Sequence, residues 1–223
     1  MANADLAQYI DHTLLKADAN LAAIEKLCQE ARTFGFWSVC VNPCWIEACR
    51  TLLAGSPVKI CTVVGFPLGA QLTLSKVFEA KAAITMGADE LDMVINVGFV
   101  KSALWSQVMI DLAAVVAAAP DHLVKVILET GLLNEEEKRQ ACAAAISAGA
   151  AFVKTSTGFG PGGATVADIQ LMKEAVGEKL KIKASGGVRD LKTMQEMIKA
   201  GASRIGTSSA VDFLQGQRST ENY

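Results

Sequence analysis

The stretch AAFVKTST, residues 150–157, carries a lysine inside an apolar run and lies between two segments with helical spacing. The segment before it opens with Asn134 and Glu137, which have the spacing of a capping box. The segment after it ends at Gly177, and glycine is a common helix stop. A short apolar run between two such segments predicts a β-strand with a helix on each side.

The same strand-and-helix unit recurs along the chain. Seven further apolar runs are each followed by a helix-like segment: residues 8–13, 36–42, 58–64, 88–97, 122–130, 180–187 and 202–208. Strand then helix, eight times over, predicts parallel strands joined by crossover helices. An open dinucleotide-binding sheet would need GxGxxG after its first strand, and that motif is missing there. We therefore expect a single α/β domain over residues 1–223, a closed (β/α)₈ TIM barrel, with a short mobile tail from about residue 215 to residue 223.

The composition limits the classes of function. Hydrophobic residues make up 51% of the 223 residues, enough for a core without metals or disulfides, and the net charge is −2. No basic run indicates nucleic acid or an anionic membrane surface, and no signal segment or membrane-spanning stretch stands out. We therefore expect a cytoplasmic protein that binds neither nucleic acid nor a membrane.

The cysteines and histidines do not have the spacing of a metal site. The six cysteines include no CxxC pair, and the chain has two histidines. Thiols of a cytoplasmic protein should be reduced. Cysteine side chains ordinarily serve as small apolar residues buried in the core. We expect no bound metal.

Three lysines lie inside strand-like runs, where polar side chains are unusual. Lys125, Lys154 and Lys183 share their runs with apolar residues, and Asp92 lies in another such run. Each lysine alone could lie along the barrel wall with its ammonium in water, and Asp92 could be a structural partner of one of them. Side chains alternate along a strand, so these four could all face the barrel interior. Buried charges are tolerated when they are paired, which favours a cluster.

Paired lysines suit one kind of chemistry. An amine attacks a carbonyl only when it is unprotonated, and an ordinary lysine is protonated at neutral pH. A second ammonium nearby, together with desolvation, lowers the pKa of such an amine. The product is a Schiff base, an electron sink for breaking or making the adjacent carbon–carbon bond. An acid such as Asp92 could then transfer protons, alone or through a water.

Glycine-rich turns follow the last two predicted strands. They are Gly186–Val188 and Gly206–Ser209. Loops after strands seven and eight form the usual phosphate site of TIM barrels, because glycines let backbone N–H groups approach the anion. The run Ser156–Gly158 could add further donors. The substrate is therefore expected to carry a phosphate.

These residues belong to longer motifs that resemble one known family, deoxyribose-phosphate aldolase. In chain order the motifs are IDHTLL (10–15), VCVNP (39–43), VVGFPLG (63–69), GADELDMVINVG (87–98), KVILETG (125–131), FVKTSTGF (152–159), KASGGVR (183–189) and RIGTSS (204–209). The resemblance covers nearly the whole chain. It implies a class I aldolase on a TIM barrel that needs no metal or cofactor. The reaction implied is reversible cleavage of 2-deoxy-D-ribose 5-phosphate to D-glyceraldehyde 3-phosphate and acetaldehyde, a step of carbohydrate degradation.

The resemblance also assigns roles to catalytic residues. It implies that Lys154 forms the Schiff base and that Lys183 is the second lysine that perturbs it. Asp92 matches the proton-transfer acid, and Asp11 matches an acid that helps to hold the catalytic water. Some relatives place a C-terminal tyrosine over the site as a proton relay, and this chain ends in Tyr223.

The remaining roles concern substrate binding. Cys40 matches a pocket cysteine that is exposed to aldehydes. The residues that match the phosphate site are Gly158, Gly186, Gly187, Gly206, Ser208 and Ser209.

Two alternatives remain open from the residues. Another Schiff-base sugar-phosphate aldolase, of transaldolase type, would keep the lysines and the phosphate loops but use a different donor. A non-catalytic barrel that binds sugar phosphates or a partner protein is the second alternative, and the presence of Lys154, Lys183 and Asp92 argues against it. A homo-oligomer is compatible with either alternative.

Overall fold

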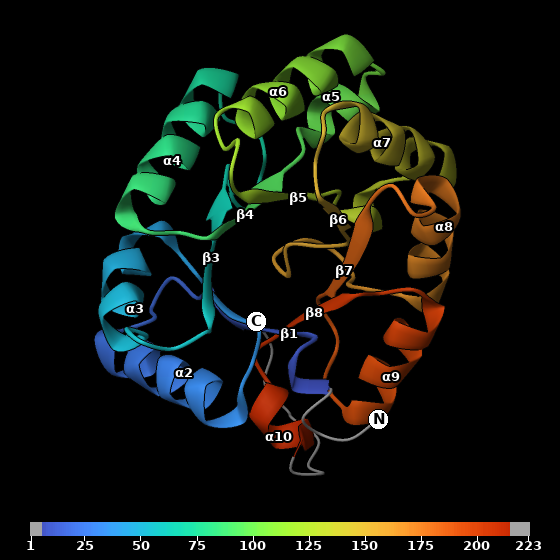
Figure 1. The fold of residues 1–223 in the computed structure, drawn as a ribbon. Coiled ribbons are helices and arrows are strands. Elements are labelled where there is room, and N and C mark those ends of the chain that lie inside the picture. The colour runs from blue at the N-terminus through green and yellow to red at the C-terminus, as the bar shows by residue number, and fades with distance from the viewer. Residues whose placement is uncertain (1–5, 215–223) are drawn as a thin grey trace.

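The computed structural model describes residues 6–214, and within this range the strands form a closed parallel barrel in chain order (Figure 1). The strands are β1 (Ile10–Leu14), β2 (Ser38–Val41), β3 (Lys59–Val64), β4 (Glu90–Val94), β5 (Leu123–Ile127), β6 (Phe152–Lys154), β7 (Lys181–Ser185) and β8 (Arg204–Thr207). Seven of them lie inside the runs predicted from the sequence, and β1 extends one residue beyond its run, to Leu14. The prediction of a (β/α)₈ barrel is confirmed.

Helices surround the barrel (Figure 1). They are α2 (Leu21–Phe34), α3 (Ile46–Leu52), α4 (Thr73–Met86), α5 (Val97–Lys101), α6 (Trp105–Ala117), α7 (Glu135–Ser147), α8 (Val166–Val176), α9 (Leu191–Ala200) and α10 (Ala210–Leu214), with short 3₁₀ turns at Pro43–Trp45 and Thr130–Leu132. The capping box of Asn134 and Glu137 opens α7 as predicted, since each side chain accepts from the other's backbone N–H. Helix α2 ends at Gly35, which adopts a left-handed conformation.

The buried residues form two compartments of opposite character. Outward-facing strand residues such as Val39, Leu91 and Val126 pack with the inner faces of the helices and make the apolar core. Inside the barrel, the inward-facing residues include seven buried charged side chains: Asp11, Glu90, Asp92, Lys125, Lys154, Lys183 and Arg204. TIM barrels usually fill this space with branched apolar residues. The interior of this barrel is therefore an ionic network wrapped in an apolar shell.

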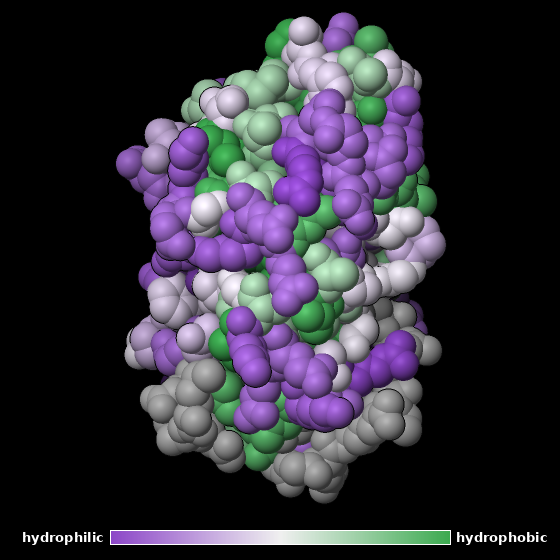
Figure 2. All heavy atoms as spheres, turned by 90° about the vertical axis from the view of Figure 1, so that its right-hand side faces the viewer, coloured by the Kyte–Doolittle hydropathy of each residue, from purple (hydrophilic) through white to green (hydrophobic). Residues whose placement is uncertain are grey.

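The outer surface differs from side to side. Figure 2 shows the side over α7–α9, where hydrophilic side chains cover much of the face. Large apolar side chains gather instead around α4. There Leu68, Leu72, Leu74 and Phe78 expose 73%, 77%, 80% and 75% of their surface, and these four are called the α4 patch below.

Two sequence predictions concern other parts of the chain. No helix of residues 6–214 is long and apolar enough to cross a membrane. The predicted tail from about residue 215 and its last residue, Tyr223, lie outside the described residues.

Candidate active site

The structure brings together three residues from three strands of the barrel. Lys154 on β6 and Lys183 on β7 each donate a hydrogen bond from Nζ to the same oxygen, Oδ2 of Asp92 on β4, at 2.8 Å in both cases. All three side chains are almost completely buried. Two ammonium groups therefore meet at one carboxylate oxygen, in a space that excludes bulk water.

Asp11 on β1 extends the cluster toward β8. Its Oδ2 lies 2.5 Å from Lys183 Nζ, and its Oδ1 accepts hydrogen bonds from Arg204 Nη1 at 2.8 Å and Ser38 Oγ at 2.7 Å. Burial opposes ionisation of this carboxyl, but Lys183 and Arg204 outweigh burial and hold the pKa of Asp11 below its usual range. Asp11 is thus a fixed anion that holds Lys183.

Lys125 on β5 is a third buried lysine in the cluster. Its Nζ donates to Asp92 Oδ1 at 2.8 Å, lies 2.7 Å from Glu90 Oε2, and donates to Cys61 Sγ at 3.3 Å. Asp92 therefore accepts from three lysines, and these hold its pKa well below the usual range although burial acts in the opposite direction. At neutral pH Asp92 is a carboxylate.

The three lysines differ in how firmly each is held. Burial lowers the pKa of Lys125 and of Lys183, but the neighbouring carboxylates raise both pKa values above the usual one, so both stay protonated. Lys183 is held by Asp11 and Asp92, and Lys125 by two carboxylates as well. Among the described residues, Lys154 has an ion pair with Asp92 alone. Lys154 is therefore held by fewer carboxylates than Lys125 or Lys183.

Aromatic and charged side chains fill the N-terminal end of the barrel beneath this cluster. The Arg204 guanidinium carbon lies 4.4 Å from the centre of the Trp37 ring and 5.4 Å from that of Phe152. Glu90 accepts from Trp37 Nε1 at 2.8 Å and from Arg204 Nη1 at 3.2 Å. This layer, the Arg204 plug, leaves the C-terminal end of the barrel as the approach to the lysines.

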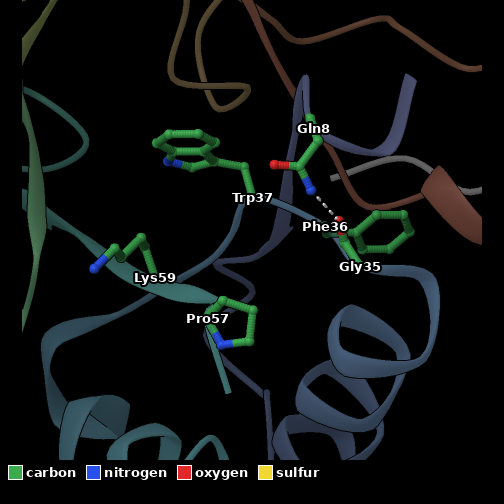
Figure 3. A pocket seen from close by; sticks show the side chains of 6 residues that line it. All are labelled: Gln8, Gly35, Phe36, Trp37, Pro57 and Lys59. Carbon is green, nitrogen blue, oxygen red and sulfur yellow. Dashed lines mark hydrogen bonds between the residues drawn. The ribbon is translucent and has the colours of Figure 1, made fainter. Parts of the chain in front are cut away.

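A cavity of about 220 Å³ lies at the N-terminal end, outside the plug (Figure 3). Its lining includes Gln8, Trp37 and Lys59, and Gln8 donates to the carbonyl oxygen of Gly35 at 2.7 Å. None of the three catalytic candidates lines this cavity. The cavity is therefore separate from the lysine cluster.

The glycines predicted to bind phosphate come together at the C-terminal end. A Cβ placed on Gly186 would lie 3.6 Å from Ser156 Cβ and 3.9 Å from Gly158 Cα. Gly158, Gly186 and Gly187 have φ of 87°, 81° and 78°, values that other residue types rarely adopt. The loops after β6 and β7 therefore form one continuous glycine-lined surface.

Two hydroxyl groups near this surface have no partner among the described residues. They are Ser156 Oγ and Ser185 Oγ, and both are buried. Ser156 shares the inward face of its strand end with Lys154, and Ser185 shares that of β7 with Lys183. A buried hydroxyl without a partner is costly, so both groups are available to a ligand.

The predicted phosphate residues after β8 lie in different surroundings. A Cβ on Gly206 would overlap Ser185 Oγ and lie 3.0 Å from Lys183 Cε, so Gly206 makes room for the Lys183 side chain. Ser209 is buried and its backbone N–H donates to Thr207 Oγ1, whereas Ser208 is half-buried. Gly206 thus has a packing role that the sequence did not indicate.

Cys40 lies on β2 beside Cys61 of β3, at the same level of the sheet. The two sulfur atoms and an oxygen of Asp92 lie within 4.8 Å of one another, and Asp11, Cys61 and Glu90 form a second such group. Cysteine spacing did not indicate these groups, because their members come from different strands. Their carboxylates already accept hydrogen bonds from lysine and arginine side chains.

Sequence reasoning missed several members of the ionic network: Glu90, Arg204 and Cys61. Strand alternation could have found Glu90, which lies two residues before Asp92 on β4. Cys61 and Arg204 lie on β3 and β8, where the sequence predicted no inward-facing residue.

Comparisons with known proteins agree with this architecture. The family model described as DeoC/LacD family aldolase matches residues 6–216. A deoxyribose-phosphate aldolase of Bdellovibrio bacteriovorus is 57% identical over 95% of this chain and 96% of its own length. Another, of Carboxydothermus hydrogenoformans, is 54% identical over the full length of both chains.

Solved structures give the same result. A putative deoxyribose-phosphate aldolase from Coccidioides immitis superimposes with a TM-score of 0.95 at 39% identity, covering 97% of this chain and 87% of the other. The deoxyribose phosphate aldolase of Aeropyrum pernix, described as a unique tetramer, has a TM-score of 0.90 at 33% identity, covering 96% and 92%.

Proposed function

The chain belongs to the DeoC/LacD family of aldolases, and on that premise we propose that it is a deoxyribose-phosphate aldolase that forms a Schiff base on Lys154. It cleaves 2-deoxy-D-ribose 5-phosphate reversibly to D-glyceraldehyde 3-phosphate and acetaldehyde, a step of carbohydrate degradation. One observation carries the assignment of the nucleophile: of the three clustered lysines, Lys154 has the fewest carboxylate partners.

The proposed reaction begins with the neutral amine of Lys154. The amine attacks the C1 carbonyl of the open-chain sugar, and loss of water leaves an iminium. Removal of the proton from the C3 hydroxyl then breaks the C2–C3 bond, and the bonding electrons move into the iminium. Glyceraldehyde 3-phosphate leaves, the remaining enamine takes a proton on carbon, and hydrolysis frees acetaldehyde and Lys154.

Lys183 and Asp92 support this sequence electrostatically. Lys183 stays an ammonium and disfavours a second positive charge on Lys154. Asp92 starts as a weak base because three lysines donate to it. When Lys154 gives up its proton, Asp92 loses one positive neighbour and becomes more basic. It can then accept and return protons, directly or through a water.

Asp11 is proposed to act through Lys183. Its carboxylate oxygens face Lys183, Arg204 and Ser38, which favours positioning of the second lysine. The family resemblance also implies that Asp11 helps to hold the catalytic water. In that role its carboxylate would accept a hydrogen bond from the water in addition to the contacts above. Tyr223 stays a proposed proton relay and Cys40 a proposed pocket residue.

The phosphate of the substrate is proposed to bind at the glycine-lined loops. The group consists of Gly158, Gly186, Gly187, Gly206, Ser208 and Ser209. The approach of the loops after β6 and β7 supports this assignment. Dianion binding there would place the sugar with C1 toward the lysines.

The remaining proposals concern the setting of the enzyme. We propose a single-domain cytoplasmic enzyme that uses no metal or cofactor and binds no nucleic acid or membrane. All six cysteines are free thiols, which supports a reducing compartment. Carboxylates that are already paired with lysines support a reaction without metal.

Self-association is proposed to use the α4 patch. Its four side chains are 73–80% exposed, so they are available to a second copy of the chain across a twofold axis. A large exposed apolar patch on a folded chain commonly marks such a contact.

One experiment tests the activity and another tests the nucleophile. Incubation with deoxyribose 5-phosphate should release acetaldehyde, whereas a transaldolase-type enzyme would instead transfer a dihydroxyacetone unit. Borohydride added with acetaldehyde should fix a two-carbon adduct on the peptide that contains Lys154. A stable adduct on Lys183 alone would reverse the assignment, and no adduct on any lysine would favour a non-catalytic barrel.

A further inference from the structure

Glu129 has an unusual backbone conformation for its residue type. It lies two residues after the end of β5, has φ of 58° and ψ of 61°, and is 4% exposed. Among non-glycine residues of the described chain, only Ala103 shares a positive φ. A residue with a Cβ adopts this left-handed conformation at a cost, and such residues gather at functional sites where the surroundings hold them. The contacts of Glu129 show what holds it.

The Glu129 carboxylate is engaged with the loop after β6. It accepts a short hydrogen bond from the Thr157 hydroxyl, and both carboxylate oxygens lie 3.3 Å from the Thr157 backbone N. Thr157 Oγ1 accepts in turn from the Phe159 backbone N–H at 3.0 Å. One carboxylate thus fixes the hydroxyl and the amide of Thr157, and through them the amide of Phe159.

Glycines let the same loop pass close over this carboxylate. A Cβ on Gly160 would lie 2.8 Å from Glu129 Cδ, and a Cβ on Gly131 would overlap the Pro161 carbonyl oxygen. The chain on both sides is therefore fitted to a carboxylate at this place. A side chain without hydrogen-bonding oxygens here would leave Thr157 unpaired in a buried position.

The loop that Glu129 holds leads to the proposed phosphate site. It carries Gly158, which lies against Gly186 of the loop after β7. It also carries Phe159, whose ring packs edge-on against Phe66 with centroids 5.3 Å apart. The lysines are held by other carboxylates, those of Asp11, Glu90 and Asp92. Glu129 therefore supports the binding loop and is separate from the lysine network.

We propose that Glu129 is a positioning residue that fixes residues 155–160 in the shape that binds the substrate phosphate. The inference rests on the proposed function and goes beyond it. Glu129 touches neither the carbonyl nor the lysines, so it sets affinity for the phosphorylated sugar and leaves the chemistry at Lys154 unchanged. The left-handed backbone aims the carboxylate across the barrel mouth at Thr157.

The first test compares two substrates in Glu129→Gln, which keeps the size of the side chain and removes its charge. KM for deoxyribose 5-phosphate should rise about tenfold while kcat changes less than twofold. Turnover of unphosphorylated deoxyribose should stay the same. Thr157→Val should give the same pattern. The double variant, with Glu129→Gln and Thr157→Val together, should have a KM no higher than either single variant, because both substitutions affect the same contact between the two side chains.

Two controls separate the carboxylate from other causes. Glu135→Gln neutralises an exposed carboxylate at the start of α7. It should leave KM unchanged both for deoxyribose 5-phosphate and for unphosphorylated deoxyribose. Glu129→Gly relieves the left-handed backbone and also removes the carboxylate, so it should share the KM defect of Glu129→Gln. Normal KM in Glu129→Gly, or equal losses on both substrates in Glu129→Gln, would overturn the proposal.

A measurement without turnover separates this inference from the proposed function. Amide hydrogen exchange of residues 155–163 should be faster in Glu129→Gln than in the wild type, and inorganic phosphate should slow exchange in the wild type only. Unchanged exchange would overturn the role of Glu129. If the wild type shows the expected exchange but releases no acetaldehyde, the aldolase activity is overturned, whereas the role of Glu129 in holding the loop still stands.

Discussion

At the scale of single residues, Lys183 is an electrostatic partner that cannot easily lose its charge. Two carboxylates hold its ammonium, and the same contacts raise its pKa. Because the raised pKa lies above 10.5, Lys183 stays protonated across the range in which the enzyme would be assayed.

Lys183→Leu should therefore shift the pH dependence of imine trapping at Lys154 to higher pH. Trapping at neutral pH should fall by at least about tenfold, because the neighbouring positive charge is gone. The measurement is borohydride trapping with acetaldehyde between pH 6 and pH 10 in both proteins. Identical titration with collapsed activity would make Lys183 a proton carrier or a substrate contact.

Gly206 offers a second prediction at this scale, because its missing side chain leaves space for Lys183. Gly206→Ala should destabilise the fold by about 1–3 kcal/mol and lower kcat, since the new Cβ overlaps Ser185 Oγ. Urea denaturation and steady-state kinetics measure both effects. Adding Ser185→Ala should recover part of the stability. A raised KM for the phosphorylated sugar at unchanged stability would instead indicate a phosphate contact.

Individual residues differed in how far sequence could predict them. Lys154, Lys183 and Asp92 were placed on inward faces because strand alternation needs only local information. Alternation also places Glu129 on the face of Lys125, but it does not predict the left-handed backbone of Glu129 or its contact with Thr157, twenty-eight positions away. Nothing in the local pattern around Glu129 specifies that contact.

At the scale of elements, the strands are shorter than the apolar runs that predicted them. The run at residues 88–97 contains β4, which ends at Val94 because the Asn96 side chain caps α5 by accepting from the Phe99 N–H. Hydrophobicity continues past the strand, so it cannot mark the end. The caps of α7 and α8 were predictable because their polar residues lie at fixed spacing.

The loop after β7 gives a prediction about phosphate binding. A Cβ on Gly187 would meet nothing within 4 Å, so a small side chain fits there without a clash, although φ is 78°. Gly187→Asp should raise KM for deoxyribose 5-phosphate at least tenfold, because its carboxylate repels the dianion. Gly187→Asn is the matched control, since it has similar shape and backbone preference without charge. Equal effects of Asp and Asn would reduce the loop to a structural role.

At the scale of the whole molecule, the ionic interior makes the fold sensitive to acid. The pKa values of Asp11 and Asp92 are lowered in the fold relative to 3.8. Below about pH 4, these two carboxyl groups bind protons in the unfolded chain while they stay ionised in the folded one. The free energy of unfolding therefore decreases as the pH falls below about 4. Urea midpoints measured from pH 6 to pH 2.5 should decline steeply at the acid end. A flat profile would mean that the lysines do not hold these carboxylates.

The α4 patch predicts the assembly state. A Leu74→Glu, Phe78→Glu double variant should sediment as a monomer at concentrations where the wild type forms at least a dimer. Leu21→Glu on α2, where the leucine is 50% exposed, adds one charge elsewhere and should keep the wild-type mass. A monomeric wild type would contradict the proposal. Removing residues 215–223 would then test whether the chain's own end covers the patch.

The Arg204 plug fixes the direction of traffic through the barrel. Since one end is filled by Arg204, Trp37 and Phe152, substrates and products share the opposite end. In the proposed mechanism the phosphorylated fragment would lie nearer that opening, and the two-carbon fragment would stay bonded to Lys154 behind it. That arrangement predicts an ordered release, with glyceraldehyde 3-phosphate leaving first and acetaldehyde second. In the synthetic direction the donor aldehyde would bind and form the enamine before the acceptor aldehyde binds.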